Sequence, residues 1–173
     1  MSIQDFGSIG ELLAAIATIA TLVYLAKQIS AFTTQSQSES EREWFNNWHN
    51  VVRSWGADPE TARIFRSGIT DWHSLETNDK LLFHTRFSAI IDHTDSLHRM
   101  HARGLVSDEL HEAQMNVCLA FLRTPGGSQW WEDIGHVFGL YPYIKSMEGR
   151  DVTPITDFAS FFLLDPEERS VDA

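Results

Sequence analysis

An uncharged apolar run near the N-terminus constrains this chain more than any other feature of its sequence. Residues 12–26 read LLAAIATIATLVYLA, and the wider stretch 6–29 carries only two charged side chains, Glu11 and Lys27. At about 1.5 Å of rise per residue, a helix over this stretch crosses the ~30 Å hydrocarbon layer of a bilayer with both charges near its edges. We therefore predict that residues 1–30 form a transmembrane anchor.

Two other kinds of segment, a secretory signal peptide and a buried core helix, have a similar composition. A secretory signal peptide begins with a basic region, whereas the first eleven residues contain Asp5 and Glu11 and no Lys or Arg. The buried core helix of a soluble protein remains the alternative to a membrane helix, because both are long and apolar.

Basic residues around the anchor predict its orientation. No Lys or Arg precedes it, whereas Lys27 follows at once and Arg42 lies within the flank that is counted for the positive-inside rule. Tyr24 suits the interface at the inner edge. The N-terminus is expected outside, and the rest of the chain in the cytoplasm.

The two faces of the anchor differ in side-chain size. At 100° per residue, a lipid-facing stripe comprises Leu12, Ile16, Ile19 and Val23. Small and polar residues occupy the other side, where helix backbones can approach closely and Thr hydroxyls can bond across the contact. Within it we predict a helix–helix interface made of Gly10, Glu11, Ala14, Ala17, Thr18 and Thr21. Its partner is a second copy of the chain, another membrane protein, or both.

Glu11 leaves two alternatives open. It can be an interfacial carboxylate without a role, or it can form a ring of carboxylates at the entrance of a small oligomeric ion channel. In the channel, Thr18 and Thr21 would line the axis.

A polar stretch joins the anchor to the next apolar pattern. Residues 31–42, AFTTQSQSESER, contain no Gly or Pro, and Trp44, Trp48 and Trp55 then recur at helical spacing. We predict that residues 31–56 form a stalk that continues the anchor as one helix, with Trp44 and Trp48 extending the association between copies. A flexible linker is the alternative.

Residues 57–173 are predicted to be a small cytoplasmic helical bundle, so that the whole chain is all-α. Asp58-Pro59-Glu60 is a strong helix start, and Ser107 is a second N-cap. A long helix over 78–103 is expected to be capped by Thr77 and stopped by Gly104. Its predicted buried stripe is Leu81, Leu82, Phe87, Ile90, Ile91, Leu97 and Met100.

The later part of the chain contains more breaks. Thr124-Pro125-Gly126-Gly127 is predicted to be a turn, with Ser128 capping a short helix that bears Trp130 and Trp131. A last apolar helix is predicted over 154–164, docked on the core, on a neighbouring subunit or at the membrane interface. Cys118 is expected to be a small core residue.

Charge excludes one class of partner. The chain has 24 Asp and Glu against 13 Lys and Arg, a formal net charge of −11. Nucleic-acid binding needs a clustered basic surface, so no nucleic acid is expected as a partner.

Several motifs together resemble a broad family of uncharacterised small bacterial proteins. They are GSIGELLAAIATIATLVYLAKQI, ADPETARIFRSGI, LVSDELHE and SQWWEDI, which lie between residues 7 and 134. The members have one N-terminal transmembrane helix and a helical domain. The resemblance implies a bacterial inner-membrane location and brings no known activity.

Histidine is the residue type best suited to catalysis or metal binding in this sequence, since eight occur and four of them fall in residues 84–101. Asp95 precedes His98 by three positions, and Asp108 precedes His111 likewise, a spacing that di-iron bundles use with Glu. Together with His101 these four are the candidate ligands of a bundle metal-site enzyme. The alternative is ordinary interhelical hydrogen bonding, and no cofactor is predicted.

Protonation of histidines on this predicted helix could also make a subunit contact depend on pH. His98 and His101 are a candidate pair that repels across a subunit contact near pH 6 to 7. Nucleophile triads, phosphate loops and Cys-rich zinc spacings are absent from the sequence. We therefore predict no enzyme, but a membrane-anchored, self-associating scaffold or accessory subunit of a membrane assembly.

Overall fold

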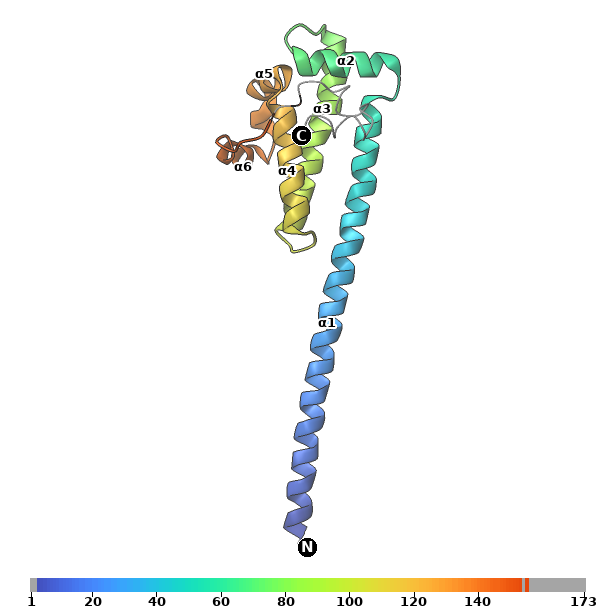
Figure 1. Cartoon of the computed structure of the whole chain (residues 1–173), viewed down its shortest axis with the longest axis vertical. Coiled ribbons are helices and arrows are strands. Elements are labelled where there is room, and N and C mark those ends of the chain that lie inside the picture. The colour runs from blue at the N-terminus through green and yellow to red at the C-terminus, as the bar shows by residue number, and fades with distance from the viewer. Residues whose placement is uncertain (1–2, 154, 156–173) are drawn as a thin grey trace, which may run out of the picture.

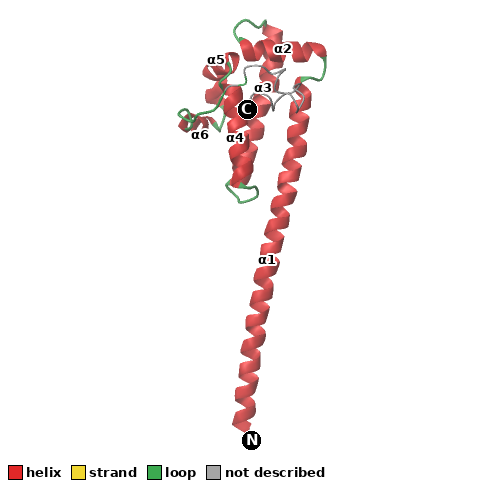
Figure 2. Ribbon diagram, in the orientation of Figure 1, coloured by secondary structure: helices red, strands yellow, loops and turns green. Residues whose placement is uncertain are grey.

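The computed structural model describes residues 3–153 and 155, and within them every regular element is a helix (Figure 2). A long N-terminal helix carries a compact helical bundle at its C-terminal end, and its N-terminal part extends away from the bundle (Figure 1). The elements are α1 (Ile3–Trp55), α2 (Pro59–Thr70), α3 (Thr77–His101), α4 (Asp108–Leu122), α5 (Pro125–Ile134), the short 3-10 helix η1 (Gly135–Val137) and α6 (Tyr141–Ser146). The predicted all-α class is confirmed.

The helix α1 runs without a break from Ile3 to Trp55, a length of 53 residues. A single helix therefore joins the predicted anchor to the predicted stalk, and the flexible-linker alternative is wrong. The apolar part of α1 is long enough to cross a membrane. An 18-residue apolar stretch of this helix has no residue buried against the rest of the described structure. The alternative of a core helix in a soluble protein is therefore wrong for this fold.

The core consists mainly of aromatic rings that α1 to α5 bring together. The rings of Trp55 and Phe65 stack with centroids 5.1 Å apart, and Phe83 stacks on Phe87 at 4.9 Å. The fully buried large side chains include Trp55, Phe65, Phe83, Phe87, Ile90, Ile91, Met115, Phe121 and Trp130. Burial of this much apolar surface is the main stabilising contribution to a bundle of this size.

Local capping residues set several helix boundaries as predicted. The Asp58 carboxylate accepts a hydrogen bond from the Thr61 backbone N–H at 2.8 Å, which lowers the pKa of Asp58. Ser107 caps α4 in the same way. Thr77 is the first residue of α3 and not its cap, since Glu76 occupies the N-cap position without a side-chain bond. Gly104 adopts a φ of 71°, the left-handed conformation that ends the α3 segment.

The predicted turn over 124–127 is wrong, because α5 begins there. Thr124 is the N-cap, its hydroxyl oxygen accepting from the Gly127 backbone N–H at 3.0 Å, and Pro125 is the first helical residue. Ser128 therefore lies inside the helix, where its hydroxyl donates to the Pro125 carbonyl oxygen. Pro followed by two glycines serves here as a helix start.

Two further predictions concern burial. Leu81 was expected in the buried stripe of α3 but is 67% exposed, because Phe83 and Phe87 face the core. Cys118 is fully buried as predicted, and burial raises the pKa of its thiol to about 12. The predicted C-terminal helix over 154–164 lies, apart from Ile155, outside the described residues.

Candidate functional site

The N-terminal part of α1 presents apolar side chains that no other part of the described structure covers. The exposed large side chains there are Leu13, Ile16, Ile19, Leu22, Val23, Tyr24, Leu25, Ile29 and Phe32. Such a continuous exposed apolar surface marks a contact with a membrane or with another protein.

The small-residue face of the same helix is also uncovered. Ala14, Ala17, Thr18 and Thr21 are exposed, as is Glu11, and Gly10 lies within the helix. The hydroxyls of Thr18 and Thr21 donate to the carbonyl oxygens of Ala14 and Ala17, at 2.9 Å in each case. Because these donors are satisfied within the helix, each hydroxyl oxygen is left as an acceptor for a neighbouring helix.

The helical repeat predicts that the small-residue face lies on the side of α1 away from the bundle. Trp44 and Trp55 mark the side of α1 that packs on the bundle. At about 100° per residue, Ala17 and Thr21 lie roughly 160° around the helix axis from that side. A neighbouring helix can therefore approach this face without meeting the bundle of the same chain.

The predicted role of Trp44 in contacts between copies needs correction, whereas that of the half-buried Trp48 stays a prediction. Trp44 is 3% exposed and packs with Leu97 and Val106 in the same chain, and Trp48 is half buried against the same cluster. The helical spacing indicated correctly that one face of α1 is covered. The cover is the chain's own bundle, and Trp44 has no surface left for a second copy.

His93 of α3 strengthens this joint between α1 and the bundle. Its ring stacks on Trp44 at a centroid distance of 4.6 Å and on Trp48 at 5.4 Å. Burial lowers the pKa of His93, so the uncharged ring is favoured between the two indoles. One turn earlier in α1, Glu41 accepts a hydrogen bond from the Ser107 backbone N–H at 2.8 Å. The contacts of α1 with the bundle thus include the N-terminus of α4.

Three of the predicted histidines do meet, at the junction of α3, α4 and α6. His98 Nδ1 and His111 Nε2 lie 3.1 Å apart, and the rings of His101 and His111 stack with centroids 4.2 Å apart. His101 Nε2 also lies 2.7 Å from Asp108 Oδ1. Tyr143 of α6 covers His98, with ring centroids 4.1 Å apart. We call His98, His101 and His111 the histidine cluster.

This arrangement is not the predicted metal site. Asp95 pairs instead with Arg99 at 2.8 Å, and His98 directs Nδ1 at a second imidazole. Among the described residues, no group of three or more His, Cys, Asp or Glu side chains is arranged to hold a metal ion. The spacing predicted which residues share a face of α3, but helix packing pairs them with other partners.

His111 is the most enclosed member of the histidine cluster, with 3% of its surface exposed. Burial is the main cause that lowers the pKa of His111, and the neighbouring His101 and His98 lower it further. Glu112 and Asp108 act in the opposite direction and raise it. The ring is therefore held in its neutral form, in which it can share a hydrogen bond with His98.

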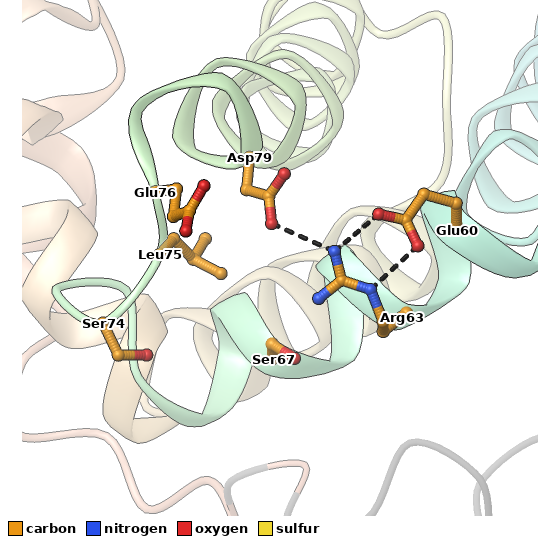
Figure 3. Close-up of a pocket in the computed structure, with 7 residues that line it drawn as sticks. All are labelled: Glu60, Arg63, Ser67, Ser74, Leu75, Glu76 and Asp79. Atoms are coloured by element: carbon orange, nitrogen blue, oxygen red, sulfur yellow. Dashed lines mark hydrogen bonds and ion pairs between the residues drawn. The ribbon is translucent and has the colours of Figure 1, made fainter.

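A polar pocket between α2 and the start of α3 was not predicted (Figure 3). It encloses about 430 Å³ and is lined by Glu60, Arg63, Ser67, Ser74, Leu75, Glu76 and Asp79. Arg63 bridges Glu60 at 2.6 Å and Asp79 at 3.1 Å, and these bonds raise its pKa. The spacing of three between Glu60 and Arg63 was the only signal in the sequence. The guanidinium is already used by the two carboxylates.

No family model matches this chain, and no curated protein or solved structure matches it at a significant level.

Proposed function

We propose that this protein is a membrane-anchored, self-associating helical module that acts as a scaffold or accessory subunit of a membrane assembly. In this proposal the anchor lies in a bacterial inner membrane, with the N-terminus outside and the bundle in the cytoplasm. The observation that carries the proposal is the uncovered apolar segment of α1, of which nothing is buried inside the molecule.

Energetics support a lipid environment for this segment. Ten Leu, Ile, Val or Phe residues lie between positions 6 and 29. At about −0.3 to −0.6 kcal/mol each they favour insertion by roughly −3 to −6 kcal/mol, against which Glu11 costs up to about 3 kcal/mol if it lies deep. A lone helix is thus only modestly stable in the bilayer, and a partner helix that shelters Glu11 makes insertion more favourable.

The continuity of α1 supports a scaffold role. The helix carries its register from the apolar segment directly into the bundle, where Trp44, Trp48 and Trp55 pack. Because a continuous helix is stiff along its axis, an orientation imposed on the anchor by a partner is passed to the bundle. A module of this kind sets the position of its domain relative to the membrane.

The direction of the small-residue face supports self-association. Ala14, Ala17 and Thr21 leave a shallow surface to which a second helix can approach closely. This face is turned away from the bundle, so two copies can pair through it with their bundles on opposite sides.

The mass of the detergent-solubilised full-length complex tests the proposal. Ala14→Leu and Ala17→Leu fill the small-residue face and are expected to reduce the complex to single chains. Ala26→Leu is the matched control, since position 26 lies within about 20° of Ile19 on the lipid-facing side at 100° per residue and the same substitution there should leave the mass unchanged. A wild-type protein that is monomeric, without a foreign partner, contradicts the self-association. A chain that remains soluble without detergent contradicts the anchor as well.

A further inference from the structure

We propose that the histidine cluster is a proton-operated latch that holds α6 on the α3–α4 hairpin and releases it on acidification. The argument rests on how three imidazoles and Tyr143 meet at one junction, independently of membrane association.

The hydrogen bond between His98 and His111 limits how many protons the pair can hold. His98 Nδ1 faces His111 Nε2 at 3.1 Å, so one nitrogen must carry the proton and the other must offer its lone pair. The bond survives with both rings neutral or with one ring charged. When both rings are charged, two N–H groups face each other and the bond is lost.

His101 adds to this limit. Its ring stacks on His111 at a centroid distance of 4.2 Å, while Asp108 offers it a carboxylate at 2.7 Å. The contact with Asp108 is an ion pair whenever the His101 ring is charged. Charging His111 next places two like charges in face-to-face contact, and His111 is buried, where solvent cannot screen them.

The other charged groups around the junction do not remove this repulsion. Those on the packed elements include Asp95 and Arg99 on α3, Asp108 and Glu112 on α4, Lys145 on α6, Arg150 after α6, and Glu41 on α1. Asp95 is paired with Arg99, Glu112 is paired with Arg150, Lys145 lies over the Tyr141 ring, and Glu41 accepts a hydrogen bond from the Ser107 backbone N–H. Asp108 contacts the histidine cluster at His101, and Glu112 and Asp108 raise the pKa of His111 against the larger effects of burial and the two imidazoles.

Release of the latch has a defined structural consequence. Tyr143 rests on His98 and Ile144 is buried against the core, so α6 is held by the surface that the histidine cluster shapes. If His111 leaves the junction to become hydrated, Tyr143 loses its support. Detachment of α6 then uncovers the apolar surface of Leu119, Leu122 and Trp131, which line a small cavity with Ile144.

The direction of the pH dependence follows from linkage. The pKa of His111 in the folded protein is lowered from its ordinary value of 6.5, so the open state binds more protons. The latch is therefore closed above that value and weakens as the pH falls below it, by up to about tenfold in the opening equilibrium per pH unit.

Hydrogen exchange of the full-length protein in detergent tests the latch between pH 8 and 5, with labelling times scaled to the intrinsic rate. Residues 141–147 should lose protection below about pH 6.5, while α2 keeps it. His111→Gln should abolish the response. His98→Gln removes the imidazole that faces His111 but not its burial, so it should weaken the response, and it remains informative if the first variant folds poorly. His49→Gln, an exposed histidine, is the control and should behave as the wild type.

Asp108→Asn separates a proton latch from a merely structural contact. Asp108 raises the pKa of His111 in the folded protein, so its removal widens the difference in proton affinity from the open state, and the loss of protection should be reached at a higher pH. Protection of 141–147 that is independent of pH in the wild type overturns the proposal. The same holds if both Gln variants retain the wild-type response, or if the onset in Asp108→Asn does not move.

Discussion

Gly126 lies so close to Gly68 that a Cβ atom at position 126 would come within 1.8 Å of the Gly68 carbonyl oxygen. The same atom would lie 2.9 Å from the Trp72 backbone nitrogen. The first turn of α5 thus packs directly against the backbone at the end of α2. This contact brings the cap of α5 and the adjacent Trp130 into the core.

Gly126→Ala should therefore destabilise the bundle strongly. Backbone atoms cannot move aside as a flexible side chain does, and overpacking typically costs about 1 to 3 kcal/mol or more. The measurement is the free energy of unfolding in denaturant, followed by circular dichroism in detergent. Gly56→Ala is the control, since nothing lies within 4 Å of the added atom. Equal effects of the two substitutions would show that α2 and α5 are not in this contact.

Removal of the Trp44 ring should reduce stability without changing the copy number. Trp44→Ala empties a buried site between α1 and α3 and is expected to cost about 3 to 5 kcal/mol in the free energy of unfolding. Phe45→Ala, on the adjacent 45% exposed residue, should have a much smaller effect. The mass of the complex, measured on the milder Trp44→Phe variant, should equal that of the wild type. A change in mass with unaltered stability would restore Trp44 to an intermolecular contact.

The sequence predicted the features that depend on neighbours along the chain. Asp58 and Ser107 act through backbone N–H groups three residues later, so the cap and its target are visible together. The length and composition of the apolar run likewise predict the exposed part of α1. These signals are local, and no knowledge of the tertiary contacts is needed to recognise them.

Features that depend on partners far along the chain were not predicted. The sequence predicts a turn at glycines 126 and 127, because the reason for the first glycine, its contact with Gly68, lies 58 positions earlier. The spacing of Trp44 and Trp48 showed that a face is covered but not that His93 covers it.

The histidine cluster shows the same division between near and distant contacts. His98 and His101 share a face of α3 by their spacing of three, as predicted. Which residue meets them is decided by the rotation of α4 about its own axis in the hairpin. That rotation brings His111 to His98 and leaves Asp95 with Arg99, four positions away on its own helix.

Thiol labelling in intact cells should reveal the orientation of the anchor. The chain has a single cysteine, Cys118, which is fully buried and whose pKa is raised to about 12, so the wild-type protein should not react with maleimide. Ser2→Cys should be labelled by a maleimide that cannot cross the inner membrane, because the N-terminus is expected outside. Ser38→Cys, on the exposed polar stretch of α1, should react only after lysis. The opposite pattern would reverse the orientation and place the bundle outside, because α1 is one unbroken helix and its two ends cannot lie on the same side of the membrane it crosses.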